Sequence, residues 1–290
     1  MKIVVIGSTG FIGSNIFNSL DKAKEHDLIG ISRNEVDLSK QNSHIDLLKY
    51  LTSDCTVIMC AGVKKQLGDS LDIFKKNLNI INNFCQTIMN SPPQKIIYFS
   101  SASVYGEDVA YSEKISEKTP FQPGTYYGIA KYTAERLLEK ACAENDTELV
   151  ILRPPLVYGK NDYSRGYGPT GFTYKAINNE EIVLWGDGTE YREFIYVDDV
   201  SKIISRLIKS SPKGIINLAS GRSYSFQQIL DFLTRILNSD IRVKEFDRTK
   251  AKVDHHYSNK KLKNLASGFE FTSLKNGLEE MCQSLNVIRK

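Results

Sequence analysis

Residues 2–13 read KIVVIGSTGFIG, an apolar run that passes through a glycine-rich turn into a second apolar segment. Nearly every position of the first run is apolar, which is typical of a strand that is buried on both faces of a sheet. Gly7, Gly10 and Gly13 follow at G-x-x-G-x-x-G spacing, so we expect a tight turn between this strand and a helix. The stretch therefore predicts the first step of a fold in which parallel strands alternate with helices.

Short β-branched runs and helical segments continue to alternate along the first half of the chain. We expect strands at residues 2–6, 28–32, 56–60, 95–101 and 148–153, and helices at residues 11–20, 43–51, 70–89 and 126–143. Residues 158–171 are rich in glycine and tyrosine and read as a loop. Beyond it we expect strands at residues 182–185 and 194–197, and helices at residues 198–209, 226–237 and 274–285.

These elements predict an α/β fold, a Rossmann-type doubly wound parallel sheet with a smaller C-terminal α/β part. We place the dinucleotide-binding domain at residues 1–155 and a mainly substrate-binding part at residues 156–290. Some segments around residues 190–220 are expected to return to the first domain. The C-terminal part is expected to pack directly on that domain and to form a cleft with it.

Composition excludes several classes of protein. With 290 residues, 41% of them hydrophobic and 25% charged, the chain is typical of a globular protein. The net charge is only +4 and no basic block stands out, so we expect no nucleic-acid partner. No stretch approaches the roughly 20 apolar residues of a membrane span, and no membrane partner is expected. The five cysteines are scattered without a C-x-x-C pair, which favours a cytoplasmic location and no metal site.

The glycine array suits a dinucleotide cofactor, because glycines let the backbone approach a pyrophosphate and the helix N-terminus supplies N–H donors. In NAD-preferring sites an acidic residue ends the second strand, whereas here Ser32 and Arg33 stand there. An arginine and a hydroxyl suit a 2′-phosphate, so we predict NADP, with NAD as the alternative and a solvent-facing Arg33 as the competing interpretation. Asp37 is a candidate partner for the adenine amine. The candidate cofactor-binding residues are Gly7, Thr9, Gly10, Phe11, Ile12, Gly13, Ser32, Arg33, Asp37, Leu38, Ala61, Gly62, Asn77, Tyr127 and Lys131.

Tyr127 and Lys131 are four residues apart in the helical segment YYGIAKYTAE, so both side chains lie on one face. A nearby ammonium favours the phenolate and makes Tyr127 a candidate acid or base. Tyr257 and Lys261 repeat the spacing, but only the first pair follows a strand that ends in serines, FSSASVYG. Ser101 is the best candidate there to hydrogen-bond a substrate oxygen.

These motifs together resemble the extended short-chain dehydrogenase/reductase family, in its nucleotide-sugar epimerase, dehydratase and ketoreductase branch. The resemblance also rests on FKKNLNIINN, LRPPLVYG, WGDGTEYREFIYVDDV and NLASGRSYS, and spans nearly the whole chain. It implies a catalytic set of Ser101, Tyr127 and Lys131, and a place near the cofactor for Asn77. It also implies that Arg192 clamps a nucleotide diphosphate, that members form homodimers, and that the substrate is a nucleotide-linked sugar. Ser101, Ser103, Tyr127 and Arg192 are the candidate substrate-binding residues.

Departures from the family pattern narrow the reaction. Members that carry out 4,6-dehydration have an Asp-Glu pair where this chain has Ala102 and Ser103. Leu156 replaces a common asparagine, and the late arginine at the diphosphate has no clear counterpart, although Lys250 or Lys252 could substitute. Tyr163, Arg165 and Tyr167 are candidates for the sugar or base pocket.

The leading hypothesis is a 4-ketoreductase that transfers hydride from NADPH to a nucleotide-linked 4-keto sugar. A 4-epimerase with tightly held NAD is the alternative, because the same three residues serve both reactions. A protein that senses NAD(P) without catalysis is the third hypothesis, and the intact Ser101, Tyr127 and Lys131 set disfavours it.

Overall fold

The computed structural model describes the chain except for residues 163–165, 167, 211 and 286–290. It divides into two compact units, each built from several segments. The first unit comprises Met1–Glu107, Thr119–Pro154 and Val200–Leu218. The second comprises Asp108–Lys118, Pro155–Asp199 and Ala219–Lys290.

A six-stranded sheet forms the centre of the first unit, and every neighbouring pair of its strands is parallel. Its order is β2-β1-β3-β4-β5-β9. The strands are β1 (Lys2–Ile6), β2 (Asp27–Ile31), β3 (Thr56–Met59), β4 (Lys95–Phe99), β5 (Glu148–Arg153) and β9 (Gly214–Asn217). The order reverses between β1 and β3, and ligands of such sheets bind at the carboxyl ends of the strands near that reversal.

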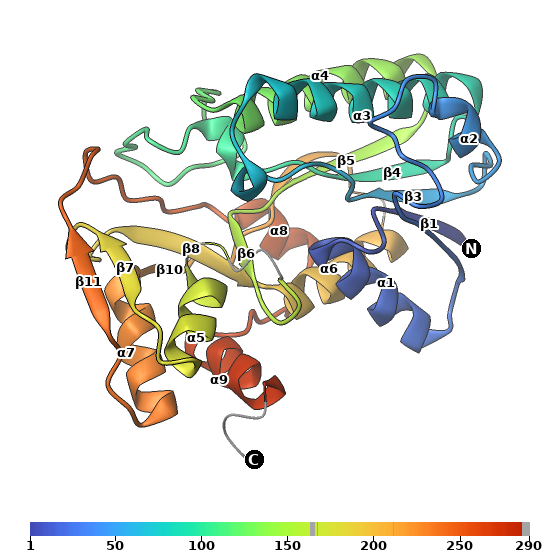
Figure 1. Cartoon of the computed structure of the whole chain (residues 1–290). Helices are drawn as coiled ribbons and strands as arrows, with labels where there is room; N and C mark the ends of the chain where they lie inside the picture. The colour runs from blue at the N-terminus through green and yellow to red at the C-terminus, as the bar shows by residue number, and fades with distance from the viewer. Residues whose placement is uncertain (163–165, 167, 211, 286–290) are drawn as a thin grey trace. The chain divides into compact units, whose positions relative to one another are not determined.

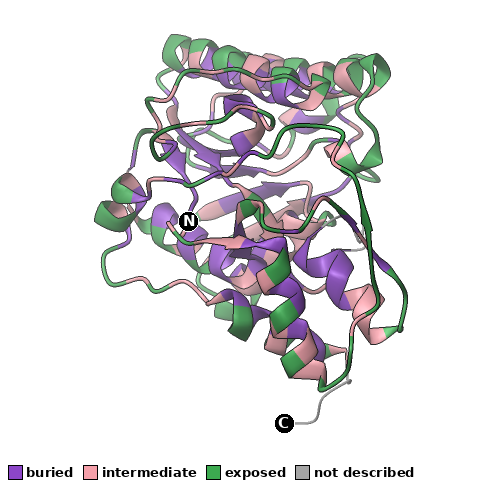
Figure 2. Cartoon of the chain, turned by 90° about the vertical axis from the view of Figure 1, so that its left-hand side faces the viewer, coloured by how far each residue is buried: buried purple, intermediate pink, exposed green. Residues whose placement is uncertain are grey.

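Helices cover both faces of this sheet, α3 and α4 on one and α1 and α6 on the other (Figure 1). The helices of the unit are α1 (Phe11–Ala23), α2 (His44–Leu48), α3 (Leu71–Asn90), α4 (Tyr126–Glu144) and α6 (Val197–Lys209), with single 3-10 turns η1 (Lys65–Leu67) and η2 (Ala102–Tyr105). Because both faces are covered, the central strands are buried throughout, as Figure 2 shows. The burial of their aliphatic side chains explains why KIVVI and KIIYF carry so few polar residues.

The second unit has two small sheets, one of order β10-β8-β6 and one that pairs β11 with β7. Its strands are β6 (Leu156–Tyr158), β7 (Ile182–Trp185), β8 (Tyr191–Tyr196), β10 (Ser223–Ser225) and β11 (Val243–Phe246). Its helices are α5 (Pro169–Ile177), α7 (Phe226–Leu237), α8 (Lys260–Leu265) and α9 (Leu274–Ser284). Helices α5, α7 and α9 pack together around a core that includes Tyr158, Phe172 and Phe226.

The predicted fold class is confirmed, and most predicted elements lie within two residues of the observed ones. The ends of α1 and α2 and the start of β8 each differ by three residues from the predicted bounds, and two further regions were assigned wrongly. Residues 169–171, predicted as loop, form the first turn of α5, because Pro169 is favourable at the start of a helix. The strand predicted to reach Ser101 ends at Phe99, and Ser101 instead caps η2.

Several short elements were missed: β9 at the edge of the central sheet, and β6, β10, β11, α5 and α8 in the second unit. The strands among them have only three or four residues, which give no clear period. Tyr163, Arg165 and Tyr167, the candidates for a base or sugar pocket, lie outside the described residues.

Gly277 in α9 gives a test of packing in the second unit. A Cβ there would lie 2.9 Å from Cζ of Tyr158, whose ring is buried and whose hydroxyl has no partner among the described residues. We expect Gly277→Ala to destabilise the protein by about 1–3 kcal/mol, since overpacking outweighs the gain in helix propensity of up to about 1 kcal/mol. Urea and thermal unfolding would measure the loss.

Tyr158→Phe supplies the matching rescue, because it removes the oxygen that an added methyl would meet. We expect Gly277→Ala to be less destabilising in that background, although the ring carbon 2.9 Å from the added methyl must still shift. Gly124→Ala is the control, since a Cβ at Gly124 has no atom within 4 Å. Equal losses with and without the Tyr158 hydroxyl would contradict the packing argument.

Candidate active site

The turn after β1 is built for a close approach of backbone to ligand. Gly7 has a φ of +87°, and its N–H and that of Ser8 donate to the carbonyl of Ile31 at the end of β2. A Cβ at Gly7 would lie 2.8 Å from the backbone N of Ala61, and one at Gly13 would lie 2.9 Å from the carbonyl carbon of Gly7. Only glycine fits these positions without a backbone shift.

Helix α1 begins directly after this turn, with Gly10 as its N-cap. No side chain of the described chain caps it, so its first amides are available to an anion. Thr9 is exposed, and Phe11 and Ile12 are partly exposed around the same turn. The glycine cradle and the uncapped helix together fit a dinucleotide pyrophosphate.

The carboxyl end of β2 carries both a cation and a carboxylate. Arg33 is exposed, whereas Ser32 is buried. The hydroxyl of Ser32 donates to Glu35 at 2.5 Å and its N–H donates to the same carboxylate oxygen at 2.8 Å. These hydrogen bonds lower the pKa of Glu35. A charged group of a ligand bound at this point would therefore meet one residue of opposite charge and one of like charge, Arg33 and Glu35.

The segment after Glu35 is fastened from two sides. Asp37 accepts from the hydroxyl and the N–H of Ser39 at 2.7 and 3.1 Å, and these bonds lower the pKa of its carboxyl. The amide of Asn83 on α3 donates to the carbonyl of Leu38 at 2.9 Å. Asp37 and Leu38 are thereby held in a fixed turn next to the end of β2.

Asn77 on α3 fixes the loop that follows β3. Its Oδ1 accepts from the N–H of Val63 at 2.8 Å and its amide donates to the carbonyl of Val63 at 3.0 Å. Gly62 is exposed, and a Cβ there would lie 3.6 Å from both Asn77 Oδ1 and Lys131 Nζ. Ala61, Gly62 and Asn77 thus adjoin the candidate catalytic ammonium.

Ser101 lies where β4 gives way to η2, with its hydroxyl oxygen accepting from the N–H of Ser103 at 3.1 Å. Its hydroxyl also lies 3.1 Å from that of Ser103, which donates to Glu107 at 2.8 Å. Glu107 pairs with Lys65. The two serines predicted from the sequence are therefore neighbours, and a carboxylate and an ammonium extend the polar chain.

Tyr127 and Lys131 lie one turn apart near the N-terminus of α4, as their spacing predicted. Thr125 caps this helix by accepting from the N–H of Gly128 at 3.1 Å. Tyr127 hydrogen-bonds Ser101, which lowers the pKa of its phenol, but the burial of that hydroxyl has the larger effect and raises the pKa to about 12. The phenol therefore keeps its proton at neutral pH.

Lys131 is buried, and its Nζ donates to the carbonyl of Phe99 at 2.7 Å and to the hydroxyl of Tyr98 at 3.4 Å. Nζ also lies 5.9 Å from the centre of the Tyr127 ring. Burial lowers the pKa of Lys131 to about 8, while the charges of Cys60 and Glu135 act in the opposite direction. The structure thus brings Ser101, Tyr127 and Lys131 together at one end of the sheet.

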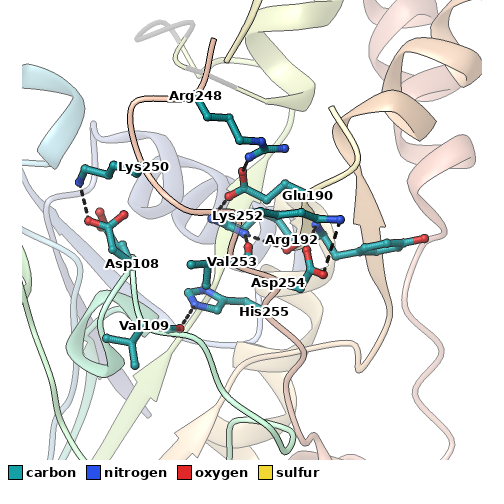
Figure 3. A network of polar contacts seen from close by, with 12 residues as sticks. Asp108, Val109, Glu190, Arg192, Arg248, Lys250, Lys252, Val253, Asp254 and His255 are labelled. Carbon is teal, nitrogen blue, oxygen red and sulfur yellow. Dashed lines mark hydrogen bonds and ion pairs between the residues drawn. The ribbon is translucent and has the colours of Figure 1, made fainter. Parts of the chain in front are cut away.

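Arg192 belongs to a separate polar cluster in the second unit, drawn in Figure 3. Its guanidinium donates to Glu190, to the carbonyl of Val253 and, at 2.9 Å, to the carbonyl of Tyr191. Glu190 also accepts from Arg248 at 2.7 Å, so one carboxylate lies between two guanidinium groups.

Lys250 and Lys252, the lysines considered as substitutes for the late arginine, are paired otherwise. Lys250 contacts Asp108 at 2.5 Å and Lys252 contacts Asp254 at 3.9 Å. Arg248 is the late cation that shares a partner with Arg192.

Sequence reasoning missed Glu35, Glu107 and Arg248. Glu35 could have been found from the S-x-x-E spacing that starts at Ser32, which places a carboxylate within reach of the serine. Glu107 lies four residues after Ser103, its hydrogen-bond donor, so that spacing was also available, whereas Arg248 carries no local signal because its partners are distant in the sequence. The second Tyr-x-x-x-Lys spacing has no shared helix face, since Tyr257 lies in an isolated bridge before α8 begins at Lys260.

No helix in the described part of the chain is long and apolar enough to cross a membrane. Within the same residues no cluster of three or more His, Cys, Asp or Glu side chains could hold a metal ion.

The glycine-rich turn follows the first strand of a doubly wound sheet, and the set of Ser101, Tyr127 and Lys131 lies beyond strand β4. These two features define a dinucleotide-binding enzyme of the extended short-chain dehydrogenase/reductase type. A model of the NAD dependent epimerase/dehydratase family matches residues 3–219. The chain belongs to this family of sugar-nucleotide epimerases and reductases.

Curated relatives agree with this assignment, and a solved structure agrees with the fold. GDP-6-deoxy-D-talose 4-dehydrogenase of Aggregatibacter actinomycetemcomitans is 27% identical in an alignment that covers 97% of each chain. dTDP-4-dehydro-6-deoxy-D-allose reductase of a Streptomyces species is 24% identical over 271 residues, 83% of each chain. The solved structure of UDP-glucose 4-epimerase with UDP-glucose from Thermotoga maritima superposes with a TM-score of 0.86 over 99% of both chains at 24% identity.

The buried Lys131 generates a prediction about stability and pH. Its pKa is about 8 in the folded protein against 10.5 for an exposed lysine, so between these values the unfolded chain binds more protons and stability rises with pH. Below pH 8 the buried ammonium costs up to about 3 kcal/mol. Lys131→Met should therefore be more stable than the wild type at pH 7, by a margin that shrinks toward pH 10.

Urea unfolding at pH 7, 8, 9 and 10 would measure this margin, with Lys22→Met on the exposed face of α1 as the control. A margin that stays constant across the pH range would show that Lys131 is not held with a lowered pKa.

Proposed function

We propose that this protein is a nucleotide-sugar 4-ketoreductase that uses NADPH. The observation that carries the proposal is the contact set of Ser101, Tyr127 and Lys131 beside the glycine cradle, together with Ala102 and Ser103 in place of the dehydratase acids. The proton-transfer groups for a reaction at one carbonyl are present, and the additional acid and base for dehydration are not.

The bound cofactor would supply the hydride, and this chain's own residues would bind the sugar and move the proton. A phenol with a pKa of about 12 holds its proton at neutral pH, so Tyr127 is suited to protonate an alkoxide as it develops. Lys131 would favour the phenolate that remains. Ser101 would donate a hydrogen bond to the carbonyl oxygen.

The relatives support chemistry at carbon 4. By their names, one is a 4-dehydrogenase of a GDP-linked sugar and another is a reductase of a dTDP-linked 4-dehydro sugar. We therefore propose a nucleotide-linked sugar as substrate, with Arg192 and Arg248 as the cations for its diphosphate and Ser103 as a further contact to the sugar. Glu190 would have to release part of its hold on both arginines when the diphosphate binds.

A 4-epimerase with tightly held NAD is the second candidate, and one observation favours it. Glu35 takes both donors of Ser32 at the end of β2, and a carboxylate there suits the ribose hydroxyls of NAD better than a 2′-phosphate. Arg33, which suits the 2′-phosphate, is one residue from Ser32. Whether NAD or NADP is preferred thus depends on whether the adenosine ribose contacts Glu35 or Arg33.

We further propose a cytoplasmic homodimer. The five cysteines are all free thiols, which suits a reducing compartment. Helices α3 and α4 expose Leu71, Met89, Tyr126, Ile129 and Leu137, apolar side chains that a partner subunit could cover.

The first test of the function is Tyr127→Phe. We expect turnover to fall by at least about a hundredfold, because general acid catalysis contributes about 10²–10⁴. Cofactor affinity, measured by fluorescence titration, should change little because the ring remains. Tyr126→Phe, on the neighbouring exposed tyrosine, is the matched control and should keep full activity. A Tyr127→Phe variant with more than about a tenth of the wild-type rate would rule out this role.

The second test separates the two candidate reactions. Steady oxidation of NADPH with a panel of nucleotide 4-keto sugars would support the reductase, whereas retained NAD⁺ without net consumption would support the epimerase. Arg33→Ala should lower and Glu35→Gln should raise the NADPH-to-NADH ratio of kcat/KM, each by about tenfold, the value of one charge-assisted contact of about 1.4 kcal/mol. Asp21→Asn, an exposed charge on α1, should leave the ratio unchanged. If neither Arg33→Ala nor Glu35→Gln changes this ratio, the charges at the end of β2 do not determine the cofactor preference.

A further inference from the structure

A fully buried ion pair lies beneath the candidate catalytic residues. Glu135 on α4 and Arg153 at the end of β5 each have an exposure of 0%. The guanidinium donates from Nε to Oε1 at 2.9 Å and from Nη2 to Oε2 at 2.5 Å, a bidentate arrangement. The hydroxyl of Ser100 donates to the same Oε1 at 2.5 Å. One carboxylate thus joins a helix to the ends of two neighbouring strands.

The remaining guanidinium donor is also used. Nη1 of Arg153 donates to the hydroxyl of Tyr105 at 2.9 Å, and that hydroxyl donates to Asn217 at 2.6 Å. The guanidinium also lies over the rings of Phe121 and Tyr105, at 4.7 and 5.0 Å from their centres. The network therefore spans α4, β4, β5, η2 and the end of β9.

Stability alone does not account for such a pair. The desolvation of two charges offsets much of their attraction, and apolar replacements of buried pairs are often neutral or stabilising. A buried, fully bonded pair can instead select one arrangement of the elements that it joins. The residues next to this ion pair indicate which elements it holds in one arrangement.

Glu135 and its hydrogen-bond partner Ser100 each adjoin a candidate catalytic residue. Glu135 lies one helical turn beyond Lys131, and Ser100 immediately precedes Ser101. Lys131 donates to the carbonyl of Phe99, and Glu135 accepts from the hydroxyl of Ser100. Two successive residues of α4's inner face are thus fastened to two successive residues at the end of β4, which fixes the register of the helix against the strand.

We propose that Glu135, held by Arg153, is a positioning residue that sets the register of α4 on β4, and with it the contact of Tyr127 with Ser101 and the location of the Lys131 ammonium. This role rests on the proposed function of those three residues. It concerns their geometry and charge, so it can be tested in the protein without substrate as well as by turnover.

The charge of Glu135 acts on Lys131 too. The groups that face the ammonium are Tyr98 from β4, Cys60 after β3, and Tyr127 and Glu135 from α4 itself. Glu135 raises the pKa of Lys131 against the larger effect of burial. Loss of the carboxylate would leave Arg153 uncompensated, lower the pKa of Lys131 further, and move the alkaline fall of kcat to lower pH.

Ser100→Ala is the decisive variant, because it removes one hydrogen bond of the register without leaving a charge unpaired. We expect kcat to fall about tenfold or more while KM and cofactor affinity stay within about twofold, since small displacements of reacting groups cost rate rather than binding. Thr147→Val is the matched control: its buried hydroxyl donates to the carbonyl of Pro93 at 2.9 Å and lies at the start of β5. It should lose comparable stability and keep its kcat.

A spectroscopic titration tests the positioning role without a measurement of turnover. The tyrosinate absorbance of the cofactor-free protein, taken as the difference from the same protein with Tyr127→Phe, reports the pKa of Tyr127. We expect Ser100→Ala to shift this pKa, because the hydrogen bond from Ser101 depends on the register. Glu135→Gln should shift it as well and move the alkaline limb of kcat downward, provided that the variant folds.

The outcomes separate the two proposals. If the wild type turns over no nucleotide sugar but Ser100→Ala shifts the phenol pKa, the positioning role stands and the proposed function fails. If Ser100→Ala keeps the wild-type kcat, pH profile and phenol pKa and loses only as much stability as Thr147→Val, the network is structural and the positioning role is wrong.

Discussion

The hydrogen bond from Lys131 to the carbonyl of Phe99 is the constraint on which the candidate site depends. An ammonium that is buried in apolar surroundings needs such an acceptor, because desolvation disfavours the charged form. The acceptor is the carbonyl of the last residue of β4, a central strand of the sheet. The interaction therefore ties the face of α4 that carries Tyr127 to the point where β4 ends and the serines begin.

Burial acts on the two ionisable groups of α4 in opposite directions. It raises the pKa of Tyr127 and lowers that of Lys131, because in each case it disfavours the charged form. The protein without ligand thus holds a neutral phenol beside an ammonium that loses its proton more readily than an exposed lysine would. A phenol in this state suits proton donation, and the ammonium costs stability that a neutral side chain would not, as is common where a site needs a buried charge.

The sequence was sufficient for the fold and for the contacts that are local along the chain. The apolar strands, the glycine turn and the four-residue spacing of Tyr127 and Lys131 each follow from a short period or a steric requirement, and the structure has them where they were expected. It was insufficient for the shortest strands, β6, β9, β10 and β11, whose three or four residues leave almost no periodic signal, and for helix α5. Pro169 is an example: proline is common in loops and also at the first position of a helix, so it did not by itself predict that α5 begins there.

Contacts between distant residues were the other part that could not be predicted. Arg248 reaches Glu190 across 58 positions, and Arg153 reaches Glu135 across 18, with nothing in either local sequence to indicate the partner. The lysines considered for the role of Arg248 were plausible on charge alone, yet they pair with other carboxylates, Lys250 with Asp108 and Lys252 with Asp254. Charge in a sequence shows which groups need partners, and only the fold determines which partners they meet.

The end of β2 matters more for the choice of reaction than the catalytic residues do. Ser101, Tyr127 and Lys131 can protonate an alkoxide or deprotonate a hydroxyl, so their geometry fits both a reductase and an epimerase. A reductase exchanges its cofactor at every turnover, whereas an epimerase returns it to its starting state. Arg33 and Glu35 set opposite charges where the adenosine ribose of a dinucleotide would lie, and only Glu35 is already bonded to the strand end. On the proposed function, the reaction would therefore depend on which charge the cofactor meets at the end of β2, three strands along the sheet from β4, after which Ser101 contacts Tyr127.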